Sequence, residues 1–361
     1  MYGIIMAGGI GKRFWPMSRT TRPKQFLRLF SENSMIRMTY ERLLPIMKNE
    51  DIFIITNKKQ NKLTAAELPE IPKSNIVCEP LGKDTAPCIG LGALFAIEKD
   101  PDAVIAVLPA DHLIKDETQF RKVLKTAGEF AAAEECLVTI GIEPTRPETG
   151  YGYIQIDESS KTSVPEAYNN NGIYKVKAFA EKPNIETAKR FIESGDFLWN
   201  SGIFIWKAQT ILQYMEEFLP ELYDTLNNLR QYINTSSFNS ELLRAYKQIK
   251  SISIDYGIME KAHDVFLVRG DFGWSDVGSW EEYYNIKDKD ENGNVCSGTC
   301  VTVDSNNNLI ISDNKLVTAI GMKDMIVVNT KDVMLICPRG DSQKVKTLVD
   351  KLTRKQLTKY L

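Results

Sequence analysis

The polar and apolar positions in the first 150 residues form short continuous apolar runs separated by longer amphipathic stretches. The apolar runs, which predict strands, lie at 2–6, 52–56, 76–77, 103–108 and 137–142. The amphipathic stretches, which predict helices, lie at 35–47, 87–97 and 117–135. Continuous apolar strands separated by helices are typical of a sheet that helices cover on both faces. We therefore expect a doubly wound α/β fold with a mixed, mainly parallel sheet.

The pattern changes twice further along the chain. Additional strands are predicted at 151–156, 174–181 and 266–269, with helices at 185–194, 208–218 and 242–249. After residue 290, apolar runs recur roughly every eight residues, as in stacked short strands or a small β-helix. These runs lie at 301–303, 309–311, 316–320, 325–328 and 333–336. We thus predict a main domain at 1–290 and a small β-rich domain at 291–361.

The last predicted element is an amphipathic helix at 342–357. Val345, Leu348, Val349 and Leu352 have the spacing i, i+3, i+4, i+7 that places them on one helix face. This face either packs on the body of the protein or forms a contact in a homodimer, and the spacing leaves both open.

Composition excludes several classes of protein. The formal net charge is -2, without the basic excess that nucleic-acid binders show. No run of about 18 apolar residues predicts a membrane span. Six cysteines without a CxxC pair, and no secretion signal, predict a reduced, cytoplasmic protein. With two histidines, His112 and His263, any catalysis must use carboxylates, lysines and arginines, with a hard metal ion as an option.

A glycine turn edged with cations follows the first predicted strand. Its glycines and cations are Gly8, Gly9, Gly11, Lys12, Arg13 and Lys24. Glycines allow backbone N–H groups to approach phosphate oxygens, and ligands bind where strands of such sheets end. The turn is neither a dinucleotide fingerprint, because Phe14 replaces the last glycine, nor a P-loop, because Arg13 follows the lysine. A tight turn with a solvated basic loop is the alternative to a polyphosphate site.

Eight ordered motifs resemble those of the sugar-1-phosphate nucleotidylyltransferases. They are GGIGKRFWPMSRTTRPKQFL at 8–27, EPLGKDTAP at 79–87, LPADH at 108–112, TGYGYI at 149–154, FAEKP at 179–183, WNSGIF at 199–204, SIDYGIME at 253–260 and WSDVGSW at 274–280. The FWPMSR and PKQFL elements resemble the mannose-1-phosphate guanylyltransferases in particular. The resemblance covers about the first 290 residues and implies that this part is a nucleotidyltransferase domain with GTP and sugar-phosphate sites.

Two carboxylates are candidates for holding a magnesium ion. Asp111 follows a predicted strand, where a side chain points into the ligand crevice, and Asp276 is the second carboxylate that the resemblance implies. Mg²⁺ prefers oxygen ligands and substrate phosphates. For Asp111, a helix N-cap is the alternative.

The sugar phosphate is expected near Glu181 and Lys182. A carboxylate suits sugar hydroxyls and a cation suits the phosphate, but adjacent side chains on a strand diverge, so a bend must aim both. A surface ion pair is the alternative. Gly150, Asn200 and Ser201 complete this predicted site.

The loop at 79–85 resembles the base-contact loop of the family. Glu79 and Asp84 offer acceptors for the N1–H and N2–H donors of guanine, and Thr85 is assigned to the same nucleotide site. The family usually has Asn at the position of Asp84, which leaves the role of Asp84 open, and an ordinary loop is the alternative.

The resemblance implies the reaction of GTP with mannose 1-phosphate to give GDP-mannose and pyrophosphate. Arg13, Lys24, Asp111, Lys182 and Asp276 are the expected catalytic residues, with Mg²⁺ as cofactor. The alternatives are another nucleotide and hexose pair, or a non-catalytic protein that binds nucleotide sugars. Some family members carry an added isomerase domain, and we expect no isomerase activity from these 361 residues.

Overall fold

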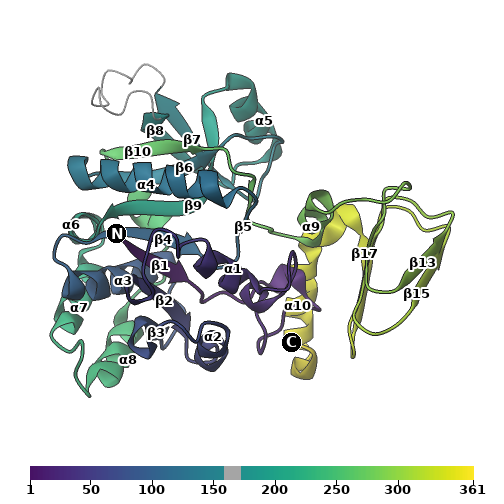
Figure 1. Cartoon of the computed structure of the whole chain (residues 1–361), viewed down its shortest axis with the longest axis horizontal. Helices are drawn as coiled ribbons and strands as arrows, with labels where there is room; N and C mark the ends of the chain where they lie inside the picture. Colours follow the sequence, from purple (N-terminus) through teal and green to yellow (C-terminus); the bar gives the residue numbers. More distant parts are fainter. Residues whose placement is uncertain (158–171) are drawn as a thin grey trace. The chain divides into compact units, whose positions relative to one another are not determined.

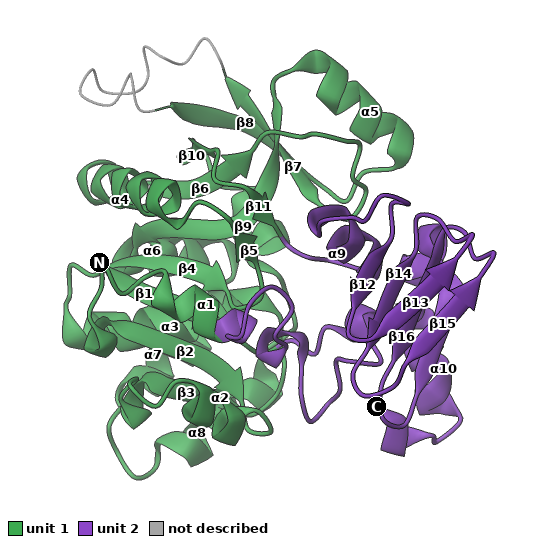
Figure 2. Cartoon of the chain, turned by 45° about the vertical axis from the view of Figure 1, so that its right-hand side comes forward, with its two compact units in different colours: residues 1–8, 37–275 green, residues 9–36, 276–361 purple. Residues whose placement is uncertain are grey.

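The computed structural model, shown in Figure 1, describes residues 1–157 and 172–361. The chain divides into two compact units, one of residues 1–8 and 37–275 and one of residues 9–36 and 276–361 (Figure 2). The second unit thus contains the glycine turn from Gly9 onward as well as the C-terminal strands. The domain boundary at 290 stays a prediction. None of the described helices is long and apolar enough to cross a membrane.

The first unit is built on a mixed sheet in the order β3-β2-β1-β4-β9-β6-β10-β8-β7. Strands β8 and β9 run opposite to the other strands of this sheet, because β9 pairs antiparallel with β4 and β6 and β8 pairs antiparallel with β7 and β10. This confirms the predicted α/β class. The strands are β1 (Tyr2–Met6), β2 (Ile52–Asn57), β3 (Ile76–Glu79), β4 (Val104–Pro109), β6 (Leu137–Ile142), β7 (Gly152–Asp157), β8 (Ile173–Glu181), β9 (Phe197–Lys207) and β10 (Val265–Gly270).

Helices cover both faces of this sheet. Helices α3, α6, α7 and α8 share one core with alternate strand residues such as Ile4, Ile105 and Val107. Helix α4 packs on the other face, where Phe120 contacts Phe272 with ring centroids 5.3 Å apart. The helices described are α1 (Met35–Glu41), α2 (Asn61–Glu67), α3 (Thr85–Lys99), α4 (Glu117–Glu134), α5 (Ile185–Ser194), α6 (Ala208–Phe218), α7 (Pro220–Arg230) and α8 (Phe238–Gln248).

Several elements of the first unit, including the unpredicted helix α2, differ from the sequence prediction. Strand β9 was not predicted, because the polar triplet Asn-Ser-Gly interrupts its apolar pattern where the β6–β9 register shifts. Helix α7 was not predicted either, since Pro220 begins it directly after α6. The helix predicted at 35–47 ends at Glu41.

The C-terminal strands of the second unit stack as coils of a β-helix-like domain. Strands β12, β14 and β16 pair in parallel, as do β13 and β15, and β17 closes the stack antiparallel to β16. Val295 pairs with Leu309 and Leu309 with Ile326, so one coil takes 14 or 17 residues and the predicted eight-residue recurrence is half a coil. The strands are β12 (Val295–Ser297), β13 (Cys300–Val303), β14 (Leu309–Ser312), β15 (Val317–Ile320), β16 (Met325–Asn329) and β17 (Met334–Pro338).

The second unit also contains helices α9 (Trp280–Ile286) and α10 (Val345–Arg354). Val345 and Val349 of α10 are buried, and the helix contacts the 3-10 turn Lys12–Phe14. This agrees with the packing role considered for the terminal helix. The expectation that all six cysteines are reduced is wrong for one pair. Cys296 and Cys300 form a disulfide, because the turn between β12 and β13 brings their Cα atoms to 6.3 Å.

Candidate active site

The first part of the site is formed by the ends of β1 and β2. The Ala7 N–H donates to the carbonyl of Ile55 at 2.8 Å, continuing the ladder beyond β1. The Gly8 carbonyl accepts from Asn57 Nδ2 at 3.1 Å and from Gln60 Nε2 at 3.4 Å. The first residue of the glycine turn is therefore fixed by side chains of the neighbouring strand end and the turn after it.

Glu79, the last residue of β3, lies beside this fixed glycine. Its carboxylate is buried, with 5% of the residue exposed, and a Cβ placed on Gly8 would lie 3.5 Å from Oε2. The Tyr246 hydroxyl donates to Oε1 at 3.1 Å. Burial raises the pKa of Glu79 to about 7, against the opposing effect of hydrogen bonds from Tyr246 and Cys88. A buried acceptor thus faces the backbone at the start of the turn.

The other two residues of the predicted base loop are engaged in local structure. Asp84 has a φ of 71°, and its side chain caps α3 by accepting from the Thr85 N–H at 2.8 Å. The Thr85 hydroxyl accepts from the Ile254 N–H at 2.8 Å. These contacts join the base loop to the SIDYGIME segment, and a nucleotide contact by Asp84 or Thr85 stays a prediction.

Asp111 lies in the connection between β4 and β5 (Leu113–Ile114). The N-cap of the following helix α4 is Asp116, which accepts from the Gln119 N–H at 2.9 Å. The alternative that Asp111 caps a helix is therefore wrong. The Ala110 N–H donates to the Met6 carbonyl at 3.0 Å, so Asp111 follows a backbone position tied to the end of β1.

A short antiparallel ladder links the segments that lead to both predicted metal ligands. Strand β11 (Trp274–Ser275) pairs with β5, with Ser275 opposite Leu113. Asp111 precedes Leu113 by two positions, and Asp276 directly follows Ser275. Beside this ladder, His112 accepts a hydrogen bond at Nδ1 from Trp274 Nε1 at 3.1 Å. The ring of His112 is thus engaged by the indole of Trp274, with the ring centroids 5.4 Å apart.

Asp111 and Asp276 stay a predicted pair of magnesium ligands, and two carboxylates are the kind of donors that Mg²⁺ takes together with substrate oxygens. Among residues 1–157 and 172–361 no cluster of three or more His, Cys, Asp or Glu side chains is arranged to hold a metal on its own. Mg²⁺ is commonly bound through one or two carboxylates plus substrate phosphates, and two aspartates match that requirement.

Glu181 and Lys182 mark the predicted sugar end of the site. Lys182 has a φ of 50°, which bends the chain after β8 so that its ammonium pairs with the Glu181 carboxylate. The bend thus forms the ion pair that the sequence left as the alternative, and a sugar-phosphate contact by either side chain stays a prediction. Burial lowers the pKa of Lys182, but the hydrogen bond and charge of Glu181 outweigh burial and raise it overall. The lysine therefore stays cationic at neutral pH.

Asp255 is a residue that the sequence reasoning missed, although it lies in the SIDYGIME motif. Asn200 donates through Nδ2 to Asp255 Oδ1 at 2.8 Å, and its Oδ1 accepts from the Gly202 N–H at 3.0 Å. Burial, and then the charge of Glu181, raise the pKa of Asp255 to about 6. The contact between Asn200 and Asp255 could have been found only from the fold, since 55 positions separate the two residues.

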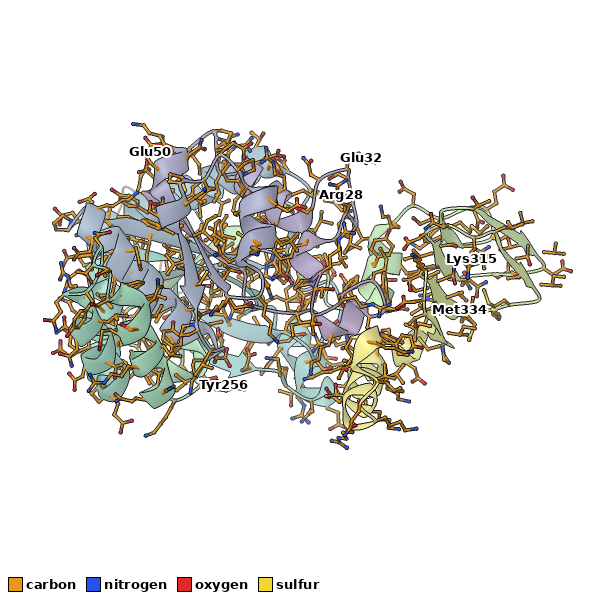
Figure 3. The ribbon with its side chains drawn as sticks, turned by 90° about the horizontal axis from the view of Figure 1, so that it is seen from below. Arg28, Glu32, Glu50, Tyr256, Lys315 and Met334 are labelled. Atoms are coloured by element: carbon orange, nitrogen blue, oxygen red, sulfur yellow. A yellow bond between two sulfur atoms is a disulfide. The ribbon has the colours of Figure 1, made fainter. Side chains whose placement is uncertain are left out.

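Other predicted sugar residues divide into structural and accessible ones. The Ser201 hydroxyl is buried and donates to the Ile140 carbonyl at 2.7 Å, within the β6–β9 bulge. Gly150 is exposed, whereas a Cβ on Gly152 would collide with the Glu181 carboxylate and lie 3.3 Å from Asn200 Cβ. Tyr256, labelled in Figure 3, is 51% exposed next to Asp255 in the chain.

The second unit holds the cationic loop. Gly11 has a φ of 69°, and a Cβ there would collide with Lys24. The Lys24 ammonium donates to the Asp276 carbonyl at 2.6 Å, which brings two predicted catalytic residues together. Lys12 pairs with Asp350 of α10 at 2.9 Å. In the described part of the chain, no side-chain hydrogen bond or ion pair engages Arg13, so its guanidinium is available to an anion.

Comparison with known proteins agrees with this architecture. The Nucleotidyl transferase family matches residues 2–293, and the MannoseP isomerase/GMP-like beta-helix domain matches residues 298–352. Mannose-1-phosphate guanylyltransferase 2 of Escherichia coli O157:H7 is 40% identical, over 99% of this chain and 74% of its own length. The chain belongs to the mannose-1-phosphate guanylyltransferase family. It is a nucleotidyltransferase with a C-terminal β-helix-like domain.

Two further relatives support this assignment. The mannose-1-phosphate guanylyltransferase of Klebsiella pneumoniae is 40% identical over 99% of this chain and 75% of its own length. A crystal structure described as mannose-1-phosphate geranyltransferase from Thermus thermophilus superposes with a TM-score of 0.86 at 33% identity. That match covers 98% of this chain and 99% of the other.

Proposed function

We propose that this member of the family transfers GMP from GTP to mannose 1-phosphate, with release of pyrophosphate and formation of GDP-mannose. The observation that carries the proposal is the pair of strand-end sites in the first unit. Glu79 beside Gly8 offers an acceptor for a base with donor groups, and Glu181 with Lys182 offers a carboxylate and a cation for a sugar phosphate.

In this reaction a phosphate oxygen of the sugar phosphate attacks the α-phosphorus of GTP, and the bond to pyrophosphate breaks. The attacking oxygen is already anionic at neutral pH, so the chain needs no strong general base. Lys182 holds the nucleophile, and Arg13 and Lys24 neutralise the charge that develops on pyrophosphate. This division of roles suits an enzyme with two histidines.

Asp111 and Asp276 would hold the magnesium ion. When bound there, the ion would supply charge neutralisation at the phosphates of GTP. The contributions of the chain itself are orientation of both substrates and fixed positive charge. Lys24, whose ammonium is held at the Asp276 carbonyl, would keep that charge next to the metal ligand.

The decisive experiment is pyrophosphate release from GTP, ATP, UTP and dTTP, each combined with mannose 1-phosphate and glucose 1-phosphate. We expect GTP with mannose 1-phosphate to give the highest kcat/KM. A higher value for UTP or dTTP with glucose 1-phosphate would assign the chain to another nucleotide and hexose. Binding of GDP-mannose without turnover of any pair would instead identify a non-catalytic protein.

The proposal extends to the setting of the enzyme. GTP and sugar phosphates are cytoplasmic metabolites, so we place the enzyme in the cytoplasm, and we retain a homodimer as its predicted assembly. Sedimentation equilibrium at two protein concentrations tests the assembly, and a monomer mass at both would reject the dimer.

A further inference from the structure

The Glu79 carboxylate is held by donors from two different helices. The hydroxyl of Tyr246, on α8, donates to Oε1 at 3.1 Å, and this hydroxyl also lies 3.4 Å from the Pro87 carbonyl. The thiol of Cys88, on α3, is the second hydrogen-bonding partner of Glu79. Tyr246 is fully buried and Cys88 is 5% exposed, so neither can itself reach a ligand.

We propose that Tyr246 and Cys88 are positioning residues that orient the Glu79 carboxylate so that Oε2 reads the amino-group edge of guanine beside Gly8. This inference rests on the proposed function, and it adds two residues to which no ligand contact or role is otherwise assigned. The geometry is specific, because Oε1 is the oxygen that Tyr246 holds and Oε2 is the oxygen that faces Gly8.

Fixing one oxygen of a carboxylate matters because the group can otherwise rotate about its last bond. A carboxylate whose Oε1 accepts from a rigid phenol presents Oε2 in one direction without further loss of conformational freedom on binding. Guanine carries an exocyclic amine next to N1–H, and inosine lacks that amine. An enzyme that reads the amine must therefore prefer GTP to ITP, since ITP leaves the buried acceptor unpaired.

The same contacts set the ionisation of Glu79. The titratable groups that face it are Tyr246 from α8 and Cys88 from α3, while Asn57 and Gln60 at the neighbouring Gly8 are neutral. Burial raises the pKa of Glu79 to about 7, and the Tyr246 hydrogen bond opposes that rise. Only the ionised form accepts through both oxygens, so activity that depends on guanine reading falls as the pH drops through this value.

The test is Tyr246→Phe, with Tyr40→Phe as the matched control. Tyr40 is equally buried and donates to Asn49 Oδ1 at 2.8 Å, so its variant loses a hydroxyl contact away from Glu79. For Y246F we expect kcat/KM for GTP to fall about tenfold, mostly through a higher KM, while kcat/KM for ITP changes little. In the pH dependence of kcat/KM for GTP, the acid limb of this variant should move to higher pH, because the Tyr246 hydrogen bond that lowers the pKa of Glu79 is gone. Y40F should show neither change.

Several outcomes decide the matter. Equal losses for GTP and ITP in Y246F, or an unmoved acid limb, would overturn the inference and leave Tyr246 as a core residue. If Y246F does not fold, Cys88→Ala carries the same comparison, because it removes the other partner of Glu79 without adding volume. Wild-type enzyme that does not use GTP would reject the proposed function itself, whereas a wild type that prefers GTP to ITP with an unaffected Y246F would reject only the positioning role.

Discussion

The two compact units hold their functional groups through contacts that span very different lengths of chain. In the unit of residues 1–8 and 37–275, Gly8 is fixed by Asn57, 49 positions away, because β1 and β2 are adjacent parallel strands. In the other unit, Trp15 Nε1 donates to the Tyr360 carbonyl at 2.7 Å across 345 positions. Lys12 meets Asp350 across 338 positions.

The residues proposed to bind the guanine base and the sugar phosphate lie in the first unit, and the cations proposed to bind the phosphates of GTP lie in the second. The base and sugar groups of the first unit, Glu79 and Glu181, are the last residues of two strands of one sheet, so the sheet itself positions them. The loop that carries the cations of the second unit is held by contacts with the C-terminal segment, at Asp350 and Tyr360. Changes to α10 and the residues after it should therefore affect the use of GTP phosphates, while changes at β8 and β9 should affect the use of the sugar phosphate.

The largest effect is expected from the two proposed metal ligands, Asp111 and Asp276. Asp111→Asn and Asp276→Asn keep the size of the side chain but remove the charge that Mg²⁺ requires. Each should lower kcat on the order of 10²–10⁴-fold, roughly 3–5 kcal/mol of transition-state stabilisation. Because both aspartates are proposed to hold the same ion, the losses of the single variants are not additive. The double variant should therefore lose little more than the worse single variant.

Turnover and metal-free thermal melts of all four proteins check this prediction. Additive kinetic losses that accompany a lowered Tm would instead identify two unrelated structural carboxylates, and the metal would need other ligands.

The second prediction concerns the sugar end alone. Lys182→Ala removes the cation that Glu181 holds beside the chain bend. We expect kcat/KM for mannose 1-phosphate to fall about 10²-fold, the loss of one charge-assisted contact to phosphate, with GTP affinity nearly intact. Steady-state turnover measures kcat/KM and calorimetric titration measures the affinity for each ligand, with Lys189→Ala on the exposed side of α5 as the control. Equal weakening of both ligands would contradict the assignment.

Much of the first unit could be predicted from its apolar pattern. Strands β1 and β6 begin and end at the predicted residues, since a continuous apolar run bounded by polar residues defines a buried strand. The positions of Asp111 and Glu181 at or just after strand ends followed in the same way, whereas Glu79 was assigned to a loop by resemblance and is the last residue of β3. Strand β9 could not be predicted, because its pattern is broken at the residues that the bulge uses.

The contacts that hold the predicted residues were not predictable. The pairing of Asn200 with Asp255, and that of Tyr246 with Glu79 across 167 positions, depend on where separate helices dock. The same is true of the segment at 9–36, which belongs with the C-terminal strands rather than with the sheet that its first residues leave. Periodicity reports which face of an element is buried, and it carries no information on which distant element covers that face.

The third prediction tests the long-span contacts of the second unit. Trp15→Phe leaves the Tyr360 carbonyl without its indole donor and should destabilise this unit by about 1–2 kcal/mol. Because Arg13 lies on the same loop, we expect the KM for GTP to rise a few-fold and the KM for mannose 1-phosphate to stay unchanged.

Trp206→Phe is the matched control for that variant. The Trp206 indole is buried in the first unit without a hydrogen-bond partner, so its variant loses similar volume and no hydrogen bond. A rise in both KM values for W15F, or a similar rise in GTP KM for W206F, would show a general loss of packing rather than a loop held by the C-terminal segment.

The smallest effect is expected from Asp350→Asn, and its sign is informative. The Lys12–Asp350 pair is half-exposed, with 41% and 42% of the two side chains accessible, and such pairs contribute little to stability. The hydrogen bond from Lys12 lowers the pKa of Asp350. The small contribution of this ion pair to stability is therefore present at neutral pH and is lost as the pH falls through the lowered pKa.

If Lys12 binds the phosphates of GTP, Asp350 competes with the nucleotide for its ammonium. D350N should then tighten GTP binding up to about twofold at low ionic strength, an advantage that salt removes. Lys12→Met should weaken GTP binding and make the further change D350N neutral. GTP titrations of D350N, K12M and the double variant distinguish two roles of the pair: competition of Asp350 with GTP for Lys12, and attachment of the loop to α10. If D350N and K12M each weaken GTP binding to the same extent, the ion pair acts by holding the loop on α10, and Arg13 rather than Lys12 is the phosphate ligand of this segment.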